Sequence, residues 1–192
     1  MLTIQFVLGI LAGALSFIAY IPYISSILKG KTKPNRASWW IWAAVGWIIF
    51  ASYFSVGARS TIWYSLPIGI SITAILSLKY GEGGLKKLDL FCLGGAALGL
   101  LVWWLSGIAF SALLVAIAVD MFAYLPTIDK SRTHPGSEDR IAWILFWIGA
   151  FLNIAAIGQW TLEIALYPLY ILVLNSIVLW LLIRKPQKKK PK

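Results

Sequence analysis

The chain has 192 residues, of which 60% are hydrophobic and 12% charged, and its mean hydropathy is +0.81. Soluble domains contain about 45–50% apolar and about 25% charged residues, so this chain carries too little polar surface to coat a water-soluble globule. Because a membrane-spanning helix needs about 20 apolar residues, the length leaves room for roughly six to eight spans, which excludes a large catalytic domain outside the membrane and makes nucleic acid an unexpected partner for the net charge of +10.

Charged and turn-forming residues divide the chain into seven apolar segments. The first lacks a basic leader and exceeds the apolar core of about 7–15 residues that signal peptides have, so we interpret it as a span. The predicted spans cover residues 3–28, 38–57, 61–79, 88–106, 108–128, 140–158 and 162–183. A single helix through the fourth and fifth segments, roughly 40 residues, would exceed a bilayer crossing, so a tight hairpin is predicted at Ser106 and Gly107.

The positions of the cationic residues favour an odd number of spans. With the N-terminus on one side, the loops after spans one, three and five and the C-terminal tail lie on the other. Sixteen of the 17 Lys and Arg residues fall on that second side, and only Arg59 falls on the first. Since cytoplasmic loops are enriched in Lys and Arg, the N-terminus is expected outside and the C-terminus in the cytoplasm, in a plasma membrane or a bacterial inner membrane. The basic tail, residues 184–192, is interpreted as a topology determinant, with anionic lipid headgroups as the alternative partner.

A weak internal repeat relates the two halves of the chain. A shift of 104 residues places Ala19–Ile24 on Ala123–Ile128, Arg36 on Arg140 and Trp39 on Trp143, and a shift of 101 residues places Pro67 on Pro168. Transporters are often built from such repeats. We therefore predict two three-helix units, residues 1–83 and 108–183, joined by a linker helix at 84–107, which gives both units the same orientation.

This arrangement resembles the SWEET/PQ-loop transporter superfamily. The resemblance lies in the 3+1+3 architecture, in prolines near the cytoplasmic ends of spans one and five, and in the segment YIPYISSILKGKTK that starts at Tyr20. It implies an all-α integral membrane fold of seven transmembrane helices, with two parallel three-helix repeats, and transport of a small solute. The PQ dipeptide itself is absent, because Tyr23 and Thr127 follow the two prolines. The family's substrate asparagines in spans three and seven have one apparent match, Asn175. The segment TKPNRASWWIW that starts at Thr32 is interpreted as the mark of an uncharacterised branch.

Asp120 is the most informative single residue. It lies about 12 residues into the fifth predicted span, roughly 18 Å along a helix that rises 1.5 Å per residue, and therefore near the bilayer centre. A central Asp costs about 2.5–3.5 kcal/mol to insert, and desolvation favours its neutral form. We interpret Asp120 as a proton-coupling group or as an acceptor for a substrate. A structural carboxyl bonded to Ser, Tyr or backbone groups is the alternative.

Further substrate-binding candidates are polar side chains within the spans. Asn175 and Asn153 can each donate and accept hydrogen bonds, as a polyol, an amide or an amino acid requires. Each would also serve as a clamp between helices. The shift of 104 residues places Ser16 opposite Asp120, so Ser16 is included among the candidates.

Aromatic residues and prolines complete the set of candidates. Trp47 and Trp147 lie well inside spans two and six, where each lines a substrate cavity or faces lipid, whereas most other tryptophans fit an interfacial belt. Proline within a helix removes a backbone hydrogen bond and favours a kink or hinge. The hinge candidates are Pro22, Pro126, Pro67 and Pro168.

These features predict a small-solute transporter that works by alternating access, with a sugar, an amino acid or a vitamin-like molecule as solute and Asp120 as the candidate for proton coupling. One copy of the chain is sufficient to form a transport path, and the sequence does not decide whether the protein forms oligomers. The alternative is a seven-helix receptor or interaction protein without flux, since KDEL receptors resemble the same fold. An enzyme is not expected, because the sequence offers no nucleophile–base pair, metal cluster or phosphate loop, and no cofactor is expected either. Glu138 and Asp139 are interpreted as helix caps rather than as metal ligands beside His134.

Overall fold

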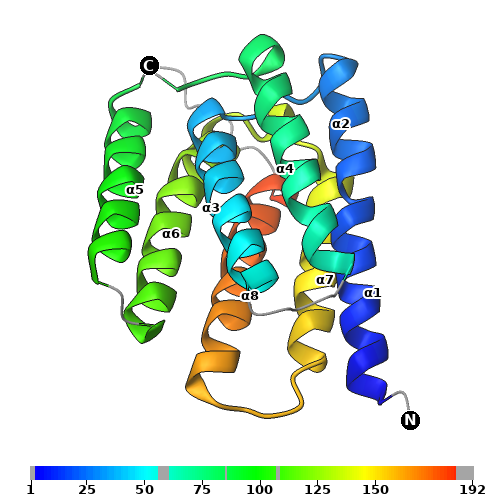
Figure 1. The fold of residues 1–192 in the computed structure, drawn as a ribbon. Coiled ribbons are helices and arrows are strands. Elements are labelled where there is room, and N and C mark those ends of the chain that lie inside the picture. Colours follow the sequence, from blue (N-terminus) through cyan, green and yellow to red (C-terminus); the bar gives the residue numbers. More distant parts are fainter. Residues whose placement is uncertain (1–2, 56–60, 85, 107–108, 185–192) are drawn as a thin grey trace.

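The computed structural model describes residues 3–55, 61–84, 86–106 and 109–184, and their regular structure is helical (Figure 1). The α-helices are α1 (Ile4–Ile18), α2 (Tyr20–Leu28), α3 (Arg36–Ser55), α4 (Thr61–Tyr80), α5 (Lys87–Ser106), α6 (Ala109–Thr133), α7 (Arg140–Ala155) and α8 (Leu162–Ile183), and a short 3₁₀ helix, η1, covers Pro135–Ser137. An isolated β-bridge joins Asn35 and Glu82. The all-helical class predicted from the sequence is confirmed.

The helices α1 and α2 form one span with a break at Ala19. Ala19 keeps helical dihedral angles and donates its N–H to Leu15 O. Pro22 has no N–H to offer the carbonyl of Ile18 four residues earlier, so the helical ladder loses one bond at this point. Counting α1 and α2 together, the described residues form seven long helices, the number that the sequence predicts.

The helix ends lie within two residues of the predicted ends except at two places. Helix α6 continues to Thr133, beyond the predicted end at residue 128, although charged residues begin at Asp129. The extra turn is stabilised because Lys130 is buried in an ion pair and Thr133 Oγ1 donates back to the Asp129 carbonyl at 2.8 Å. Helix α7 ends at Ala155, before the predicted residue 158.

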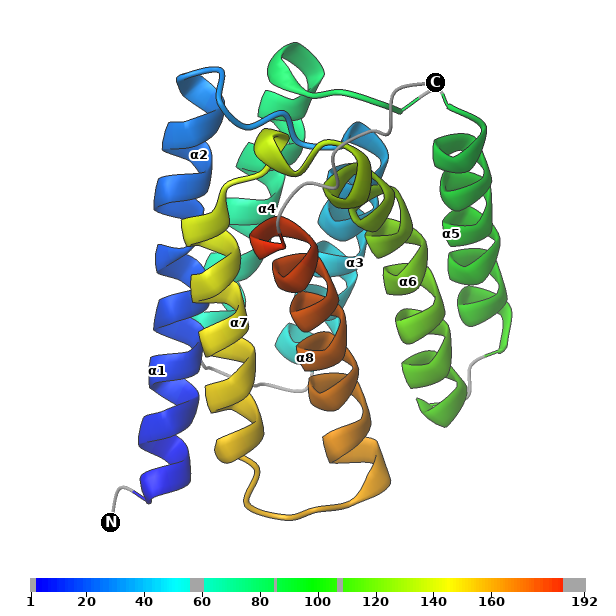
Figure 2. The same cartoon turned by 180° about the vertical axis from the view of Figure 1, so that it is seen from behind.

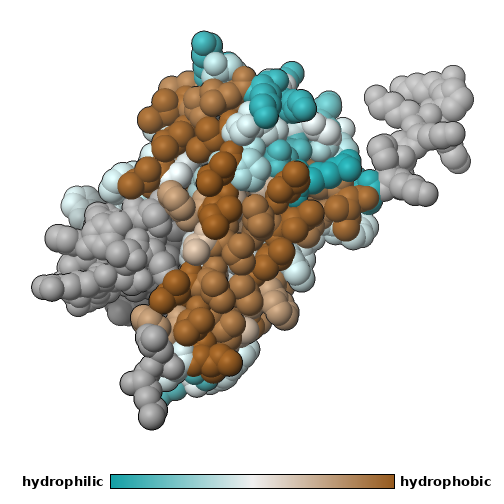
Figure 3. Space-filling model, turned by 90° about the vertical axis from the view of Figure 1, so that its right-hand side faces the viewer, coloured by the Kyte–Doolittle hydropathy of each residue, from teal (hydrophilic) through white to brown (hydrophobic). Residues whose placement is uncertain are grey.

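Two of the described helices are long and apolar enough to cross a membrane, Ile4–Leu28 and Ile164–Ile183. Large apolar side chains also lie on the outside of the bundle: Ile4, Phe91 and Trp104 are 71%, 65% and 78% exposed. Figure 3 shows that apolar residues cover much of one flank, with most of the hydrophilic surface in its upper part. Membrane association is therefore plausible for the chain.

Six of the spans pack in a closed ring (Figures 1 and 2). Going round it, the α1–α2 span contacts α4, α4 contacts α3, α3 contacts α6, α6 contacts α8, α8 contacts α7, and α7 returns to α1. Helix α5 lies outside the ring, against α6 and to a smaller extent α3. The predicted hairpin between the fourth and fifth spans agrees with the side-by-side packing of α5 and α6, while residues 107–108 lie outside the described residues.

The loops that follow α2, α4 and α6 meet at one end of the bundle, which we call the basic end. Lys33 N–H donates to Ser137 O at 2.9 Å, and Glu82 N–H donates to Pro34 O at 3.0 Å. Most of the described Lys and Arg residues lie in or beside these loops. The rest of the basic tail, residues 185–192, and Arg59 lie outside the described residues.

Candidate functional site

Asp120 lies on the buried side of α6, together with Tyr124 one turn later. Their exposed fractions are 3% and 5%. Residues four apart share one face of a helix, and the side chains that meet this face come from α3 and α8. The carboxyl of Asp120 therefore faces the junction of three consecutive helices of the ring.

The polar atoms at this junction are incompletely paired. Trp42 of α3 and Tyr170 of α8 lie beside the Asp120 carboxyl. Even so, the buried Asp120 Oδ2 and Tyr170 hydroxyl, although neighbours, make no hydrogen bond of normal geometry with each other or with another described residue. Buried polar groups are nearly always satisfied in folded proteins, so an unpaired carboxylate oxygen next to an unpaired hydroxyl marks a place where a ligand, a water or a proton is needed.

Aromatic rings surround the carboxyl. The ring centroids of Trp42 and Tyr124 are 5.0 Å apart at an interplanar angle of 76°, and those of Tyr124 and Tyr170 are 6.5 Å apart at 88°. Tyr167, one turn before Tyr170 on α8, has its ring centroid 6.0 Å from that of Tyr170. The first two pairs are edge-to-face, an arrangement that aromatic side chains prefer, and the third is tilted. They form a wall that joins α3, α6 and α8.

Asn175 belongs to the same cluster and is 5% exposed. The Tyr124 hydroxyl donates to Asn175 Oδ1 at 2.7 Å, and Asn175 Nδ2 donates to the carbonyl of Phe146 on α7 at 3.4 Å. The amide thus connects α6, α7 and α8. The structure brings together two of the residues singled out from the sequence, Asp120 and Asn175, and adds Trp42, Tyr124 and Tyr170, which were not among the predicted site residues.

Ser16 lies elsewhere, at the contact between α1 and α7. Its hydroxyl donates to the Ala12 carbonyl of its own helix at 2.9 Å. Gly149 of α7 is what lets the two helices approach, because a Cβ atom at this position would lie 2.5 Å from Ser16 Oγ. Ser16 is therefore a packing residue at a close helix–helix contact in this structure.

The remaining substrate candidates lie away from Asp120. Trp47 is 48% exposed, and its Nε1 donates to Ser71 Oγ of α4 at 2.9 Å. Trp147 Nε1 makes the equivalent bond to Ser176 Oγ of α8 at 2.8 Å. Asn153 is exposed on α7. The structure does not bring these three side chains to the carboxyl.

The prolines lie inside the helices, as predicted. Pro126 and Pro67 are buried, while Pro22 and Pro168 are partly buried. The residue after Pro126, Thr127, donates its hydroxyl to Ser38 Oγ of α3 at 2.8 Å.

Tyr23, which follows Pro22, also donates to a residue of the other half of the chain. Its hydroxyl contacts Glu138 Oε2 at 2.8 Å. Thus each of these two prolines is followed by a hydroxyl that binds a residue of the opposite half of the chain.

The sequence analysis missed a buried ion pair at the basic end. Lys130 Nζ lies 2.5 Å from Glu138 Oε1, and the two side chains are 3% and 0% exposed. The ammonium also donates to the carbonyls of Lys33 and Ser137, and Trp143 Nε1 donates to Glu138 Oε2 at 2.9 Å. The interpretation of Glu138 as a helix cap was therefore wrong. The sequence signal that could have indicated this ion pair is the short spacing between Lys130 and Glu138, which flank a turn that contains proline and glycine.

Asp139, in contrast, is a helix cap as interpreted. Its Oδ1 accepts the N–H of Ala142 at 2.8 Å at the start of α7. Asn35 has the same role at the start of α3, where its Oδ1 accepts the Ser38 N–H at 3.1 Å. Such caps satisfy N–H groups that the first helical turn leaves unpaired.

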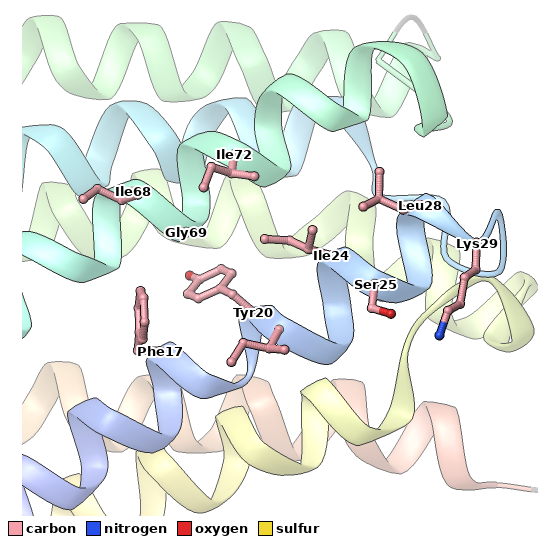
Figure 4. Close-up of a pocket in the computed structure, with 10 residues that line it drawn as sticks. Phe17, Tyr20, Ile24, Ser25, Leu28, Lys29, Ile68, Gly69 and Ile72 are labelled. Atoms are coloured by element: carbon pink, nitrogen blue, oxygen red, sulfur yellow. The ribbon is translucent and has the colours of Figure 1, made fainter.

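A groove of about 550 Å³ runs between the α1–α2 span and α4 (Figure 4). The lining is mainly apolar, with Lys29 at one end, and Tyr20 lies against Gly69. A Cβ atom at Gly69 would be 2.5 Å from the Tyr20 ring, so the glycine is what admits the ring. Neither Asp120 nor Asn175 lines this groove.

No protein-family model, curated protein or solved structure matches this chain.

Proposed function

We propose that this chain is a seven-span membrane protein that carries a small polar solute by alternating access between its two three-helix units. The observation that carries the proposal is the buried, incompletely paired carboxyl of Asp120 at the junction of α3, α6 and α8. Ionisable residues within membrane spans are costly and mark substrate or proton pathways. Solute binds beside Asp120, and Asn175 holds the surrounding helices in register.

The packing order of the ring supports the two-unit architecture. In each proposed unit the third span lies between the first and the second: α4 lies between the α1–α2 span and α3, and α8 lies between α6 and α7. Between units, the first span of each contacts the second span of the other, α1 with α7 and α6 with α3. Exchanging the two units therefore reproduces the same set of contacts, as expected for a repeat with two-fold pseudosymmetry.

Local chemistry at the helix starts agrees with this repeat. Asn35 and Asp139, the caps of α3 and α7, are separated by 104 residues. Tyr23 and Thr127, whose hydroxyls donate to the other half of the chain, have the same separation. A shift found from proline, arginine and tryptophan positions thus also relates residues with equivalent hydrogen-bonding roles.

The exposed apolar flanks and the clustering of cationic loops at the basic end support a membrane orientation with this end in the cytoplasm. At the basic end the two units are joined by the hydrogen bond from Tyr23 to Glu138 and by the one from Thr127 to Ser38. Alternating access requires that such contacts break and re-form. In this proposal the structure is the state in which the cytoplasmic end is closed.

Reconstitution into liposomes tests the proposal. Purified wild type, Asp120→Asn and the control Asp129→Asn are each reconstituted into liposomes. The liposomes are loaded with pooled sugars, amino acids, amines and vitamin precursors, and solute and proton fluxes are recorded after a pH step. Asp129 is the control because it lies on the same helix but is 43% exposed at its side chain. Solute flux that accompanies proton flux in wild type and control, and is lost in Asp120→Asn, is the expected result.

Two other results would change the assignment. Solute flux that Asp120→Asn leaves intact would make the protein a facilitator and Asp120 a structural group. Absence of flux for every pooled solute, from protein shown to be folded by circular dichroism, would contradict the transporter proposal and favour a receptor.

A further inference from the structure

We infer that the solute accepted beside Asp120 is a small organic ammonium ion, held by the carboxylate and by the aromatic side chains of Trp42, Tyr124 and Tyr170. The inference rests on the proposed function for its biological meaning, but it concerns binding alone.

The first argument is the missing positive charge. Among the described residues, the ion pairs use Glu138 and Asp129 as their carboxylates, and neither Lys nor Arg pairs with Asp120. An isolated carboxylate that is 3% exposed is strongly disfavoured unless it is protonated or meets a cation. A cationic ligand supplies the charge that the protein itself does not provide.

The second argument is the composition of the wall. Three helices of the ring each contribute one aromatic side chain next to the carboxyl, Trp42 from α3, Tyr124 from α6 and Tyr170 from α8. The faces of Trp and Tyr rings attract organic cations, and this attraction grows when water is excluded. A carboxylate among such rings has the chemistry of an ammonium site.

The third argument is the hydrogen-bonding capacity that remains free. Both ends of the Asn175 amide are already engaged, Oδ1 by Tyr124 and Nδ2 by the Phe146 carbonyl. The unpartnered atoms are Asp120 Oδ2 and the Tyr170 hydroxyl. A sugar requires several donors and acceptors at once, and an anion would be repelled by the carboxylate. An ammonium ion requires one acceptor with negative charge, which Asp120 Oδ2 is.

In this arrangement the cation and a proton compete for the Asp120 carboxylate, so only one of them can be bound at a time. The protonated carboxyl loses its proton to solvent as the ammonium ion binds, so the buried site stays neutral. The other titratable groups near Asp120 are Tyr124 on α6, Tyr167 and Tyr170 on α8, and Cys92 on α5, whose side chain packs in one cluster with Val119 and Ala123 of α6. Trp42, from α3, does not titrate. None of these groups carries a positive charge, so Asp120 is the group that releases the proton.

The test uses probes that differ in charge but little in shape. Choline is compared with the neutral 3,3-dimethylbutan-1-ol, and benzylammonium with benzyl alcohol, by calorimetry on the full chain in detergent. Weakly buffered solution with a pH indicator records proton release. We expect each cation to bind at least about tenfold more tightly than its neutral counterpart, with release of up to one proton per cation bound.

The variants locate the effect. In Asp120→Asn the preference for the cation and the proton release should disappear, whereas Asp129→Asn should retain both. Equal binding of the charged and neutral probes by wild type, or no heat from either cation at millimolar concentration, would overturn the inference. A cation preference that persists in folded Asp120→Asn would also overturn it. Because the charge contrast is measured on wild type, the result does not depend on folding of the variant.

Binding and flux separate this inference from the proposed function. Cation binding with proton release but without flux in liposomes would refute transport and leave the site assignment intact. Flux of a neutral solute by protein that binds neither cation would support transport and refute the ammonium site.

Discussion

Replacing Lys130 by methionine should destabilise the fold far more than loss of an ordinary ion pair. The Lys130 ammonium contacts Glu138 Oε1 and the carbonyls of Lys33 and Ser137. These three acceptors use all three of its N–H donors. Methionine fills a similar volume but offers none of them, so the Glu138 carboxylate stays buried without a countercharge.

The expected cost follows from the burial of the partner left behind. The Glu138 side chain is 0% exposed, and removing one member of a buried ion pair costs about 3–5 kcal/mol. Tyr23 and Trp143 still donate to Glu138 Oε2, which places Lys130→Met toward the lower part of this range.

A double variant tests whether charge is the cause. In Lys130→Met/Glu138→Gln no buried charge remains, and the new amide oxygen still accepts from Tyr23 and Trp143. The double variant should therefore be more stable than Lys130→Met alone, although it carries one more substitution. Replacing both members of a buried ion pair is often nearly neutral for the same reason.

Equilibrium unfolding in mixed micelles, followed by circular dichroism, measures these free energies. The control is Asp129→Asn, which removes the exposed pair with Arg132, whose atoms are 3.7 Å apart with side chains 66% and 43% exposed. This control should change stability by less than about 1 kcal/mol. A double variant less stable than Lys130→Met, or a Lys130→Met variant no less stable than the control, would refute the reasoning.

Three further substitutions probe single contacts by the same unfolding measurement. Thr127→Val removes the hydroxyl that donates to Ser38 Oγ at 2.8 Å and should cost about 1 kcal/mol; an unchanged midpoint would mean that this bond contributes nothing. Gly149→Ala places a Cβ atom 3.1 Å from a backbone oxygen of α1 and should cost about 1–3 kcal/mol of stability. At Gly94 nothing lies within 4 Å of the added Cβ atom, so Gly94→Ala should stabilise α5 by about 0.5–1 kcal/mol. Equal effects at the two glycines would contradict the packing argument. Asp139→Ala removes the cap of α7 and should cost about 1 kcal/mol of stability. Asp139→Asn keeps an oxygen that can accept the same hydrogen bond, so its stability should be close to that of wild type. An equal loss of stability in both variants would contradict the capping role.

The spans were predictable because they depend on local composition. Each helix of the structure lies on an apolar run, and the ends differ where a distant contact decides them. Helix α6 passes residue 128 because Lys130 gains Glu138 as a partner across the η1 turn. The distribution of charges alone predicts that the helix ends before Asp129, because it suggests that Lys130 is a solvent-exposed loop residue.

The candidate site was predictable only in part. Asp120 and Asn175 were selected because polar groups in apolar spans stand out from their neighbours, and both lie in the same cluster. Trp42 and Tyr170 could not be selected in this way. They sit in spans that hold many aromatic residues, and which ring faces inward depends on how each helix is rotated in the packed ring. The same rotation takes Trp47 and Asn153 to exposed positions.

The hydroxyls of Thr127 and Tyr23, which join the two halves of the chain, suggest how the closed end would open under the proposed function. Thr127 and Ser38 join α6 to α3 by a bond between neutral groups, worth about 0.5–1.5 kcal/mol. On the other side, Tyr23 donates to the carboxylate of Glu138, and bonds to charged groups are worth about 1.5–3 kcal/mol. The two bonds therefore occupy equivalent positions in the proposed repeat but differ in strength. We expect α3 and α6 to separate first, with the contact of Tyr23 and Glu138 as the pivot. Spin labels on the two pairs of helices in liposomes would report this order, and simultaneous separation of both pairs would contradict it.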